Sequence, residues 1–441
     1  MAGISPWQNE PNQMPKPWRK RALWAGAAVV VTALLVLAYA NLTASSGKVE
    51  HAVPHRYAPA DPQFVRVMGS LLGPAMLSGN KVASLLNGDE VFPAMLTAIR
   101  GAQHTITFET YIYWSGEVGE QFAEALSERA RAGVKTHVLL DWVGSGKMEP
   151  SMLDGMEKAG VEVVRYRPLR WYNRDRLNNR THRKLLVIDG RIGFTGGIGV
   201  ADHWLGHAQD PDHWRDSHFR VEGPVVAQLQ AAFMDNWIES KGKILDGAEY
   251  FPAVEPVGSQ SAQAFRSSPS EGSATMRLMY LLAIAAAERR ILIANAYFVP
   301  DSLVVDMLVQ ARERGVDVQI IVPGPVLDAQ IVRRASRARW GPLLRAGVKI
   351  YEYQPTMYHT KVMVVDDIWS SVGSTNFDDR SFRLNDEANL NVLDPAFGAE
   401  QVRVFAQDRA RSRQITLAEW ERRPWTERLQ ERFATLVKSQ L

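Results

Sequence analysis

One pattern of three side chains occurs twice in the sequence with identical spacing. It consists of a histidine, one residue, a lysine, four residues and an aspartate, and its members are His182, Lys184 and Asp189, then His359, Lys361 and Asp366. Six residues separate each aspartate from a glycine-containing segment, GGIG at 196–199 and GSTN at 373–376. A chance match at two equivalent places is improbable. The duplication therefore predicts a chain built from two related halves.

The segments before the two motifs repeat one order of hydrophobic patterns. In each segment, amphipathic helical stretches alternate with short apolar runs, which lie at 106–108 and 138–140 in the first copy and at 291–293 and 320–322 in the second. Alternating strands and helices are typical of right-handed crossovers around a buried parallel sheet. We therefore expect an α/β fold of two tandem repeats with largely parallel sheets.

Proline, glycine and charge patterns divide the chain into parts. Prolines and glycines are frequent between the two repeats, and prolines are also frequent before residue 80. The expected parts are a basic tail at 1–21, a transmembrane anchor at 22–42, a linker at 43–80, a first half at 81–245, an inter-repeat connection at 246–275 and a second half at 276–441. We expect most regular structure to begin near Leu85.

The N-terminal region has the pattern of a membrane-spanning helix. The nineteen residues at 22–40 contain no charged side chain, and about twenty apolar residues are needed to cross a bilayer. Basic residues precede this run, so the positive-inside rule places the N-terminus in the cytoplasm and the catalytic part outside it, at the cell membrane. The alternative is a cleaved signal peptide, because Ala38 and Ala40 form a small-x-small cleavage pattern.

Charge and cysteine content narrow the functional classes. Four of the 51 basic side chains and one of the 48 acidic ones lie in residues 1–21, which leaves 47 of each sign in the remainder. This balance argues against a globally basic nucleic-acid-binding domain, so we expect no nucleic-acid partner. The absence of cysteine excludes disulfides, iron–sulfur clusters and thiol catalysis. No sequence feature points to an obligate protein partner.

Paired histidines and lysines suit phosphodiester transfer. Side chains two residues apart share a strand face, so each histidine should lie beside its lysine. One imidazole can attack phosphorus while the other exchanges protons with the leaving and entering hydroxyls, and the lysines can stabilise the phosphate charge. This chemistry needs no metal and no cofactor. The supporting residues that we expect are Ser374 and Asn376 at the phosphate, and Asp216 and Glu387 as partners that fix the histidine tautomers.

We expect the aspartates of the motif to have a structural role. Asp189 and Asp366 stand seven residues after their histidines, an odd offset that turns them to the opposite face of a regular strand. We therefore assign them to ion pairing or loop closure, although they belong to the catalytic motif. For one His–Lys pair taken alone, a buried polar pair in a sheet would be the simpler interpretation. Its repetition at equivalent positions favours catalysis.

These residues resemble the phospholipase D superfamily, and within it the bacterial cardiolipin synthases, over about 80–441. Beyond the motifs, the local matches are NGDE at 87–90, FETYIY at 108–113, YFVP at 297–300, NFD at 376–378 and RSFRLNDE at 380–387. The resemblance implies two halves around one shared active site and metal-independent transfer through a phosphatidyl-histidine, with His182 as nucleophile and His359 as acid and base. In the first glycine segment, which includes Gly197, relatives often carry asparagine where this chain has Gly199. One phosphate-binding donor is then missing or supplied by a backbone amide.

The resemblance implies a membrane-bound phosphatidyltransferase that joins two phosphatidylglycerol molecules of a phospholipid membrane into cardiolipin and releases glycerol. Three alternatives stay open. The same residues could hydrolyse phospholipid to phosphatidic acid with water as the acceptor. The chain could also be a single-strand nuclease of the superfamily, or a catalytically silent membrane scaffold.

Two further patterns receive a structural interpretation. The stretch 416–441 carries five large apolar residues at near-helical spacing, namely Trp420, Trp425, Leu429, Phe433 and Leu436. We expect this face to pack into the core, and the alternative is a second membrane contact. Four histidines cluster between residues 203 and 218, and we expect no metal ion there.

Overall fold

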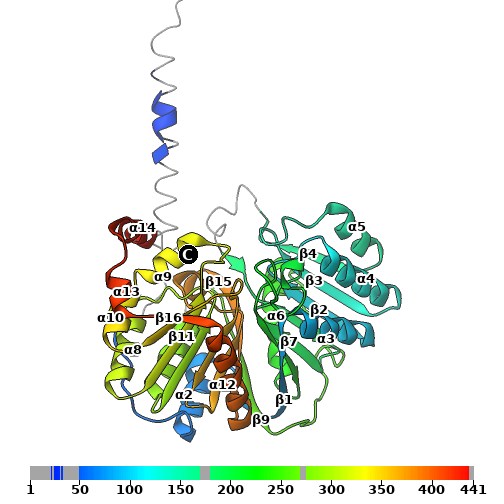
Figure 1. The fold of residues 1–441 in the computed structure, drawn as a ribbon. Helices are drawn as coiled ribbons and strands as arrows, with labels where there is room; N and C mark the ends of the chain where they lie inside the picture. Colours follow the sequence, from blue (N-terminus) through cyan, green and yellow to red (C-terminus); the bar gives the residue numbers. More distant parts are fainter. Residues whose placement is uncertain are drawn as a thin grey trace, which may run out of the picture. The chain divides into compact units, whose positions relative to one another are not determined.

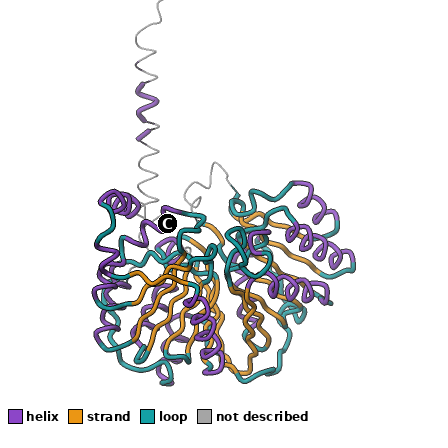
Figure 2. Tube along the Cα trace, viewed as in Figure 1, coloured by secondary structure: helices purple, strands orange, loops and turns teal. Residues whose placement is uncertain are grey.

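The computed structural model describes residues 21, 24–29, 31–32, 49–168, 179–268 and 275–436. Among the helices of these ranges, none is long and apolar enough to span a bilayer. The anchor expected at 22–42 lies largely outside the described residues. Residues 46–441 form one compact unit, in which strands gather in the middle and helices lie around them (Figures 1 and 2).

Strands of both halves join into one mixed sheet whose order repeats. From one edge the order is β16, β12, β11, β10, β13, β14, β15, β9, and then β1, β8, β7, β6, β2, β3, β4. Apart from β16, the run from β12 to β9 corresponds strand by strand to the run from β4 to β1, taken from the outer edges towards the centre. The prediction of two related halves is confirmed by this order.

The bounds of the strands follow the same division. Those of the first half are β1 (Leu77–Leu86), β2 (Thr105–Thr110), β3 (Lys135–Asp141), β4 (Glu162–Tyr166), β5 (Arg180–Thr181), β6 (Leu185–Ile188), β7 (Ile192–Gly196) and β8 (Ser217–Glu222). Those of the second half are β9 (Gln260–Ser267), β10 (Arg290–Asn295), β11 (Asp317–Pro323), β12 (Lys349–Tyr353), β13 (Lys361–Val365), β14 (Trp369–Gly373), β15 (Asn385–Leu393) and β16 (Ser412–Ile415).

The sheet is less parallel than the sequence predicts. Pairing is parallel in β2–β3–β4 and in β10–β11–β12, where helices carry the chain back. It is antiparallel in β6–β7–β8 and in β13–β14–β15. The prediction of largely parallel sheets is therefore wrong after each motif, because the three-residue turns that follow β6 and β13 reverse the chain direction.

Helices cover the outer flanks and the centre of the sheet (Figure 1). The first half contributes α3 (Asn87–Gly101), α4 (Glu117–Arg131) and α5 (Pro150–Lys158), and the second half contributes α7 (Thr275–Ala286), α8 (Ser302–Glu313), α9 (Gln330–Arg337), α10 (Trp340–Arg345), α11 (Asp379–Arg383), α13 (Leu417–Glu421) and α14 (Trp425–Leu436). The matched helices α6 (Val226–Lys241) and α12 (Pro395–Ala410) each follow the last antiparallel strand of their half.

The matched helices α4 and α8 show how the repeat is encoded. Each buries apolar side chains spaced three or four residues apart, such as Val118 and Phe122 in α4 and Val304 and Leu308 in α8. Each is followed by a glycine in the left-handed region, Gly133 with φ 90° and Gly315 with φ 91°. The next apolar run then forms β3 or β11, whose side chains are almost all buried.

The segment that the sequence assigns to a linker is structured from residue 62. Helix α2 (Pro62–Leu72) buries Phe64, Met68 and Leu72 in the core of the second half. Strand β1 then pairs with both β8 and β9, so it joins the two halves. The prediction of a loose linker over 43–80 is therefore wrong for residues 62–80, and regular structure begins before Leu85. Proline was a misleading signal, because Pro62 lies in the first turn of α2, where a helix tolerates proline.

The C-terminal stretch also departs from the prediction. Trp420 in α13 packs against the core of the second half, whereas Trp425, Leu429 and Phe433 of α14 are exposed. The expectation of core packing is therefore wrong for α14, and the side chain of Leu436 lies outside the described part of the chain. Apolar residues at helical spacing identify a shared face, but they do not show what covers that face.

Candidate active site

The two motifs occupy equivalent places, just before the antiparallel strands of each half. His182 and Lys184 lie between β5 and β6, and His359 precedes β13, which begins at Lys361. In each motif the lysine Nζ donates to the carbonyl oxygen of its own histidine, at 2.8 Å for Lys184 and 2.5 Å for Lys361. All four side chains are buried. Each histidine therefore stands beside its lysine, as the spacing predicts.

Each histidine is held by a carboxylate from the other half. Nδ1 of His182 lies 3.0 Å from both carboxylate oxygens of Glu387, at the start of β15. Nδ1 of His359 lies 2.6 Å from Oδ2 of Asp216, just before β8. An ionised carboxylate only accepts hydrogen bonds, so each Nδ1 carries the proton and each Nε2 is left to react. The structure thus pairs the predicted tautomer partners crosswise.

Backbone pairing between the halves brings the crossed partners together. Strand β5 pairs in parallel with the start of β15, and the amide of His182 donates to the carbonyl of Asp386 at 2.9 Å. At the equivalent place, the amide of His359 donates to the carbonyl of Arg215 at 2.8 Å. In both cases the carboxylate that holds the imidazole is the next residue after the accepting carbonyl. The same arrangement of a backbone hydrogen bond and an adjacent carboxylate therefore occurs at both histidines.

Both histidines open into a single cavity of about 350 Å³. Its lining combines the two halves and includes Tyr111, Arg180, His182, Lys184 and Trp214 from the first and Tyr297, His359, Asn376, Arg380 and Asn385 from the second. Aromatic rings flank both imidazoles, with centroid distances of 5.4 Å from Tyr111 to His182 and 5.3 Å from Trp214 to His359. The cavity is thus walled by aromatic rings and lined by basic and amide side chains, together with the aspartates Asp328 and Asp378.

Burial lowers the pKa of both histidines. The pKa of His182 falls to about 4, because burial disfavours the imidazolium more strongly than the Glu387 carboxylate favours it. Burial, and then the charge of Lys361, also lower the pKa of His359. Both imidazoles are therefore neutral near pH 7, which is the state that a nucleophile or a general base requires.

The lysines and carboxylates are shifted as well. Burial lowers the pKa of Lys184 to about 7 and that of Lys361 to about 8. Burial alone would raise the pKa of Glu387 and Asp216, but the histidine and lysine charges beside them lower it in both cases. The carboxylates thus remain ionised. An anion that enters the cavity would favour the protonated form of the lysines.

The glycine pair of the first motif makes room for a carboxylate. A Cβ placed on Gly197 would stand 2.2 Å from Oδ1 of Asp216, so only glycine admits that side chain. A Cβ on Gly199 would stand 3.0 Å from Cβ of Ile112, and Gly199 is not among the described residues that line the cavity of about 350 Å³. Both glycines therefore shape the wall behind the histidines.

The two polar residues of the second glycine segment have different surroundings. Oγ of Ser374 donates to Oε2 of Glu387 at 2.5 Å and accepts from the amide of Ala388 at 3.0 Å, so its hydroxyl orients the partner of His182. Asn376 lines the cavity, as expected for a phosphate contact. Of the four residues expected at the phosphate, Lys184 and Asn376 line the cavity, whereas Ser374 and Lys361 are not among the described residues that line it.

The motif aspartates close loops at the far ends of their strands. The carboxylate of Asp189 accepts hydrogen bonds from the amides of residues 103–105 at 2.7–2.9 Å. The carboxylate of Asp366 accepts from the amides of residues 288–290 at the same range of distances. Both aspartates have φ 52°, in the turn that follows β6 or β13. These contacts match the loop closure that the odd offset indicated.

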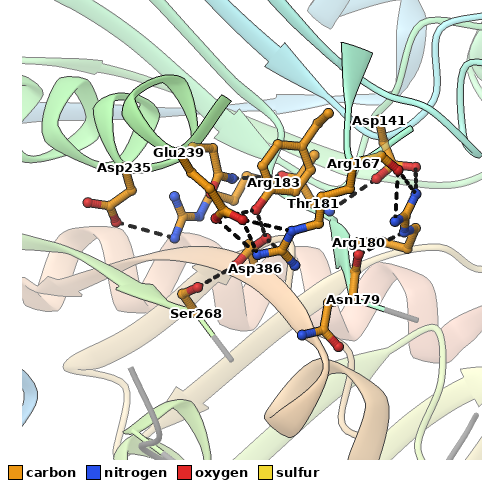
Figure 3. Close-up of polar contacts among 12 residues, drawn as sticks. Asp141, Arg167, Asn179, Arg180, Thr181, Arg183, Asp235, Glu239, Ser268 and Asp386 are labelled. Atoms are coloured by element: carbon orange, nitrogen blue, oxygen red, sulfur yellow. Dashed lines mark hydrogen bonds and ion pairs between the residues drawn. The ribbon is translucent and has the colours of Figure 1, made fainter. Parts of the chain in front are cut away.

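The sequence does not predict a buried polar network around Arg183 and Asp386, the residues next to His182 and Glu387 in the chain (Figure 3). Asp386 accepts from the hydroxyls of Tyr166 at 2.8 Å and Ser268 at 2.6 Å. Arg183, between the motif histidine and lysine, lies 3.5 Å from the Asp235 carboxylate and donates to the carbonyl of Ser267. The network connects β4, α6 and the segment between β5 and β6 to β9 and β15. Its one sequence signal is that Asp386 directly precedes Glu387.

In the histidine cluster at 203–218, His203 packs against an aromatic ring and His213 lies beside the Asp210 carboxylate. The ring of His203 stacks on Trp214, with centroids 5.4 Å apart and an angle of 9° between the planes. Trp214 in turn contacts His359, and the indole of Trp204 donates to Oδ2 of Asp216 at 3.1 Å. These aromatic residues, which were not expected at the site, hold the second histidine and its carboxylate.

Comparison with known proteins agrees with this geometry. Residues 95–237 and 280–409 match the family described as cardiolipin synthase, PLD-like domain, and each segment contains one motif. The chain is 35% identical over 361 residues to a cardiolipin synthase of Geobacillus kaustophilus, which covers 81% of this chain and 72% of that protein. It is also 35% identical over 390 residues to cardiolipin synthase A of Pseudomonas fluorescens, which covers 88% and 81%.

A solved structure shares the fold. The crystal structure of the phosphatidylserine synthase of Haemophilus influenzae aligns with a TM-score of 0.65 and 14% sequence identity over 86% of this chain and the whole of that one. Two matched segments, two motifs and one cavity between crossed His–carboxylate pairs therefore lead to one conclusion. The chain belongs to the cardiolipin synthase family of phospholipase D-like proteins.

Proposed function

We propose that the protein transfers a phosphatidyl group from one phosphatidylglycerol molecule to another, producing cardiolipin and glycerol. The observation that carries this proposal is the pair of histidines, each held by a carboxylate of the other half and both open to one cavity. Such a pair can divide a phosphodiester exchange into two successive displacements at one phosphorus atom.

In the first displacement, Nε2 of His182 attacks the phosphorus of the bound lipid. The P–N bond forms, the P–O bond to the glycerol headgroup breaks, and His359 gives its Nε2 proton to the departing oxygen. His359 must be protonated for this step, and the negative charge of the bound phosphodiester favours that form. The phosphatidyl group is then held covalently on His182.

In the second displacement, a hydroxyl of a second phosphatidylglycerol molecule takes the place of the departed glycerol. His359, now neutral, accepts the hydroxyl proton while the oxygen attacks phosphorus, and the P–N bond to His182 breaks. Both histidines return to their starting states. With water as the acceptor, the same steps would yield phosphatidic acid.

We assign to the two lysines the stabilisation of negative charge on the phosphate. Lys184 and Lys361 lie beside the two histidines, and an ammonium there stabilises the non-bridging oxygens as charge grows on them. Asn376 adds an amide at the cavity wall. Asp216 and Glu387 hold the tautomers, and Gly197 and Ser374 position these carboxylates.

We further propose that residues 22–42 anchor the protein in the cell membrane, with the catalytic part outside the cytoplasm and the phospholipid bilayer as its partner. The support for this location is the uncharged run at 22–40 and the basic residues before it.

Product analysis tests the proposed reaction. The purified full chain is incubated with phosphatidylglycerol, and the lipids are separated by chromatography. We expect cardiolipin and glycerol in equal amounts, and neither product from His182→Ala. Phosphatidic acid without cardiolipin would replace the proposal by hydrolysis, and cleavage of single-stranded oligonucleotides without lipid turnover would replace it by a nuclease.

Trapping of the intermediate tests the two histidine roles separately. With phosphorus-labelled lipid, a covalent adduct should accumulate in His359→Ala and be absent from His182→Ala. The opposite pattern would exchange the roles of the two histidines.

A further inference from the structure

Helix α14 presents large apolar side chains to solvent. Trp425 is 73% exposed, Leu429 46% and Phe433 63%. These residues are four positions apart, so they follow one another along a single face of the helix. We call them the apolar ridge of α14. Scattered exposed apolar residues are common on soluble proteins, whereas an aligned row that includes a tryptophan is typical of interaction sites.

Contacts on the opposite face of α14 hold the helix in an orientation that leaves the ridge exposed to solvent. Ala434 is buried and packs in one cluster with Val332 and Ala335 of α9. The buried carboxylate of Glu431 lies 2.9 Å from a guanidinium nitrogen of Arg423 and 3.5 Å from Nε of Arg337. The helix is therefore held to the protein by its own inner face, and the ridge is left without a partner within the described chain.

Helix α9 connects the ridge to the active site. α14 packs on α9, and the two helices lie side by side in Figure 1. Ile331 of α9 is 43% exposed and also lines the catalytic cavity. Arg334, three residues further on the same helix, is exposed as well. The ridge and the mouth of the cavity thus share one supporting helix.

The charges around the ridge suit an anionic surface. Arg428 and Arg432 are exposed and lie one helical turn apart, on one flank of the ridge. The guanidinium of Arg428 also donates to the carbonyls of Glu421 and Arg423, and it keeps its charge in that contact. The carboxylates of Glu427 and Glu431 turn the other way, towards Arg337. Tryptophan with neighbouring arginines is the composition that lies at the boundary between lipid headgroups and acyl chains.

The size of the cavity leaves the acyl chains of a lipid outside. About 350 Å³ is at the small end of pockets that hold drug-sized ligands. It accommodates a headgroup and a phosphate, but not two long acyl chains in addition. A two-chain substrate must therefore reach the histidines while its chains remain in a bilayer beside the cavity mouth.

We propose that the apolar ridge of α14 docks the catalytic unit on an anionic phospholipid bilayer, with the mouth of the cavity at the lipid surface. This inference rests on the proposed function only in taking a bilayer lipid as the substrate. Docking inserts Trp425, Leu429 and Phe433 at the acyl boundary and places Arg428 and Arg432 among the headgroups.

A single-cysteine probe tests the contact directly. The natural sequence has no cysteine, so Phe433→Cys in the full chain can carry one fluorophore without background. The matched control is Val257→Cys, an exposed apolar position near residue 79, at the end of β1 away from the histidines. In phosphatidylglycerol vesicles we expect iodide to quench the Phe433→Cys probe at least about threefold less than the control. Equal quenching would overturn the proposal.

The same probe distinguishes a bilayer from a second copy of the chain. Protection that persists in non-ionic detergent and grows with protein concentration would assign the ridge to self-association and overturn lipid docking. In neutral phosphatidylcholine vesicles, we expect weaker protection than in phosphatidylglycerol, because the flanking arginines lose their counter-charges.

An activity measurement tests the docking proposal independently. The triple variant Trp425→Ser, Leu429→Ser, Phe433→Ser should turn over vesicle lipid about tenfold more slowly, yet turn over dissolved short-chain phosphatidylglycerol within about twofold of the parent rate. The double variant Phe251→Ser, Val257→Ser, also at exposed positions, should match the parent on both substrates. An unchanged rate of the triple variant on vesicles would contradict docking. If the parent forms no cardiolipin, the proposed function fails, and the quenching result still decides whether the ridge binds lipid.

Discussion

Both carboxylate oxygens of Glu387 lie 3.0 Å from Nδ1 of His182, although the two residues belong to different halves of the chain. The reverse contact joins His359 of the second half to Asp216 of the first. Each histidine therefore acquires the carboxylate that holds its Nδ1 proton only when the other half is folded against it. Duplication has produced one site that neither half can assemble alone.

Replacement of Glu387 by glutamine tests the importance of this contact. The neutral amide no longer holds the Nδ1 proton by charge and can present an N–H to the ring, so the reactive tautomer loses its preference. We expect Glu387→Gln to lower kcat by about a thousandfold or more, as for other catalytic histidines that lose their carboxylate. Steady-state assays with short-chain phosphatidylglycerol measure this loss, and circular dichroism checks the fold. A loss below tenfold would show that the tautomer is set by something else.

Ser374 distinguishes an orienting role from a phosphate contact. Its hydroxyl donates to Glu387, so Ser374→Ala should lower kcat about tenfold, by the loss of one hydrogen bond to a charged group, and leave KM nearly unchanged. The comparison is Asn376→Ala, which removes an amide from the cavity wall and should raise KM. A raised KM with unchanged kcat in Ser374→Ala would place its hydroxyl at the phosphate after all.

The motif residues were predictable because their chemistry is local. The spacing of His182 and Lys184 predicted adjacent side chains, and the repeat predicted a second pair. The odd offset of Asp189 indicated loop closure, which its three backbone contacts match. In each case the argument needed only the alternation of side chains along a strand.

Features that depend on distant contacts were not predictable in this way. The crossed pairing of Glu387 with His182 is set by the alignment of β5 on β15, more than 200 residues apart in the chain. Periodicity placed Phe433 on an apolar face but could not show that nothing in the described chain covers it. Turn length, not hydrophobicity, decided the strand direction after each motif.

The lysine charges predict how activity depends on pH. Burial lowers the pKa of Lys184 to about 7 and that of Lys361 to about 8. In the proposed mechanism the ammonium forms stabilise the phosphate and His359 must carry a proton, so kcat/KM should fall as the pH rises through about 7–8. Rate measurements with a water-soluble phosphatidylglycerol between pH 5 and 9 test this. A flat profile up to about pH 9 would show that the lysines stay charged or are not needed.

The free energy of unfolding should change with pH in the opposite direction. Both lysines bind protons less tightly in the folded protein than at their usual pKa of 10.5, so the unfolded chain carries more protons between about pH 7 and 10. The cost of the buried charges is fully present below about pH 7 and disappears as the pH rises towards 10. Denaturant titrations should therefore give a smaller increase across this window for Lys184→Met than for the parent.

The turn aspartate Asp189 should matter for stability and not for the chemical step. Its carboxylate accepts hydrogen bonds from three backbone amides, and asparagine tolerates its φ of 52° while it offers only one accepting oxygen. Asp189→Asn should therefore lower the free energy of unfolding by about 1–3 kcal/mol and leave kcat per folded molecule within about twofold. Asp366→Asn, at the equivalent turn, should behave in the same way. The turn lies at the end of β6 away from the histidine, so its loss should affect catalysis only by destabilising the fold. A drop in kcat of more than tenfold at unchanged stability would therefore show that the motif aspartates take part in the reaction.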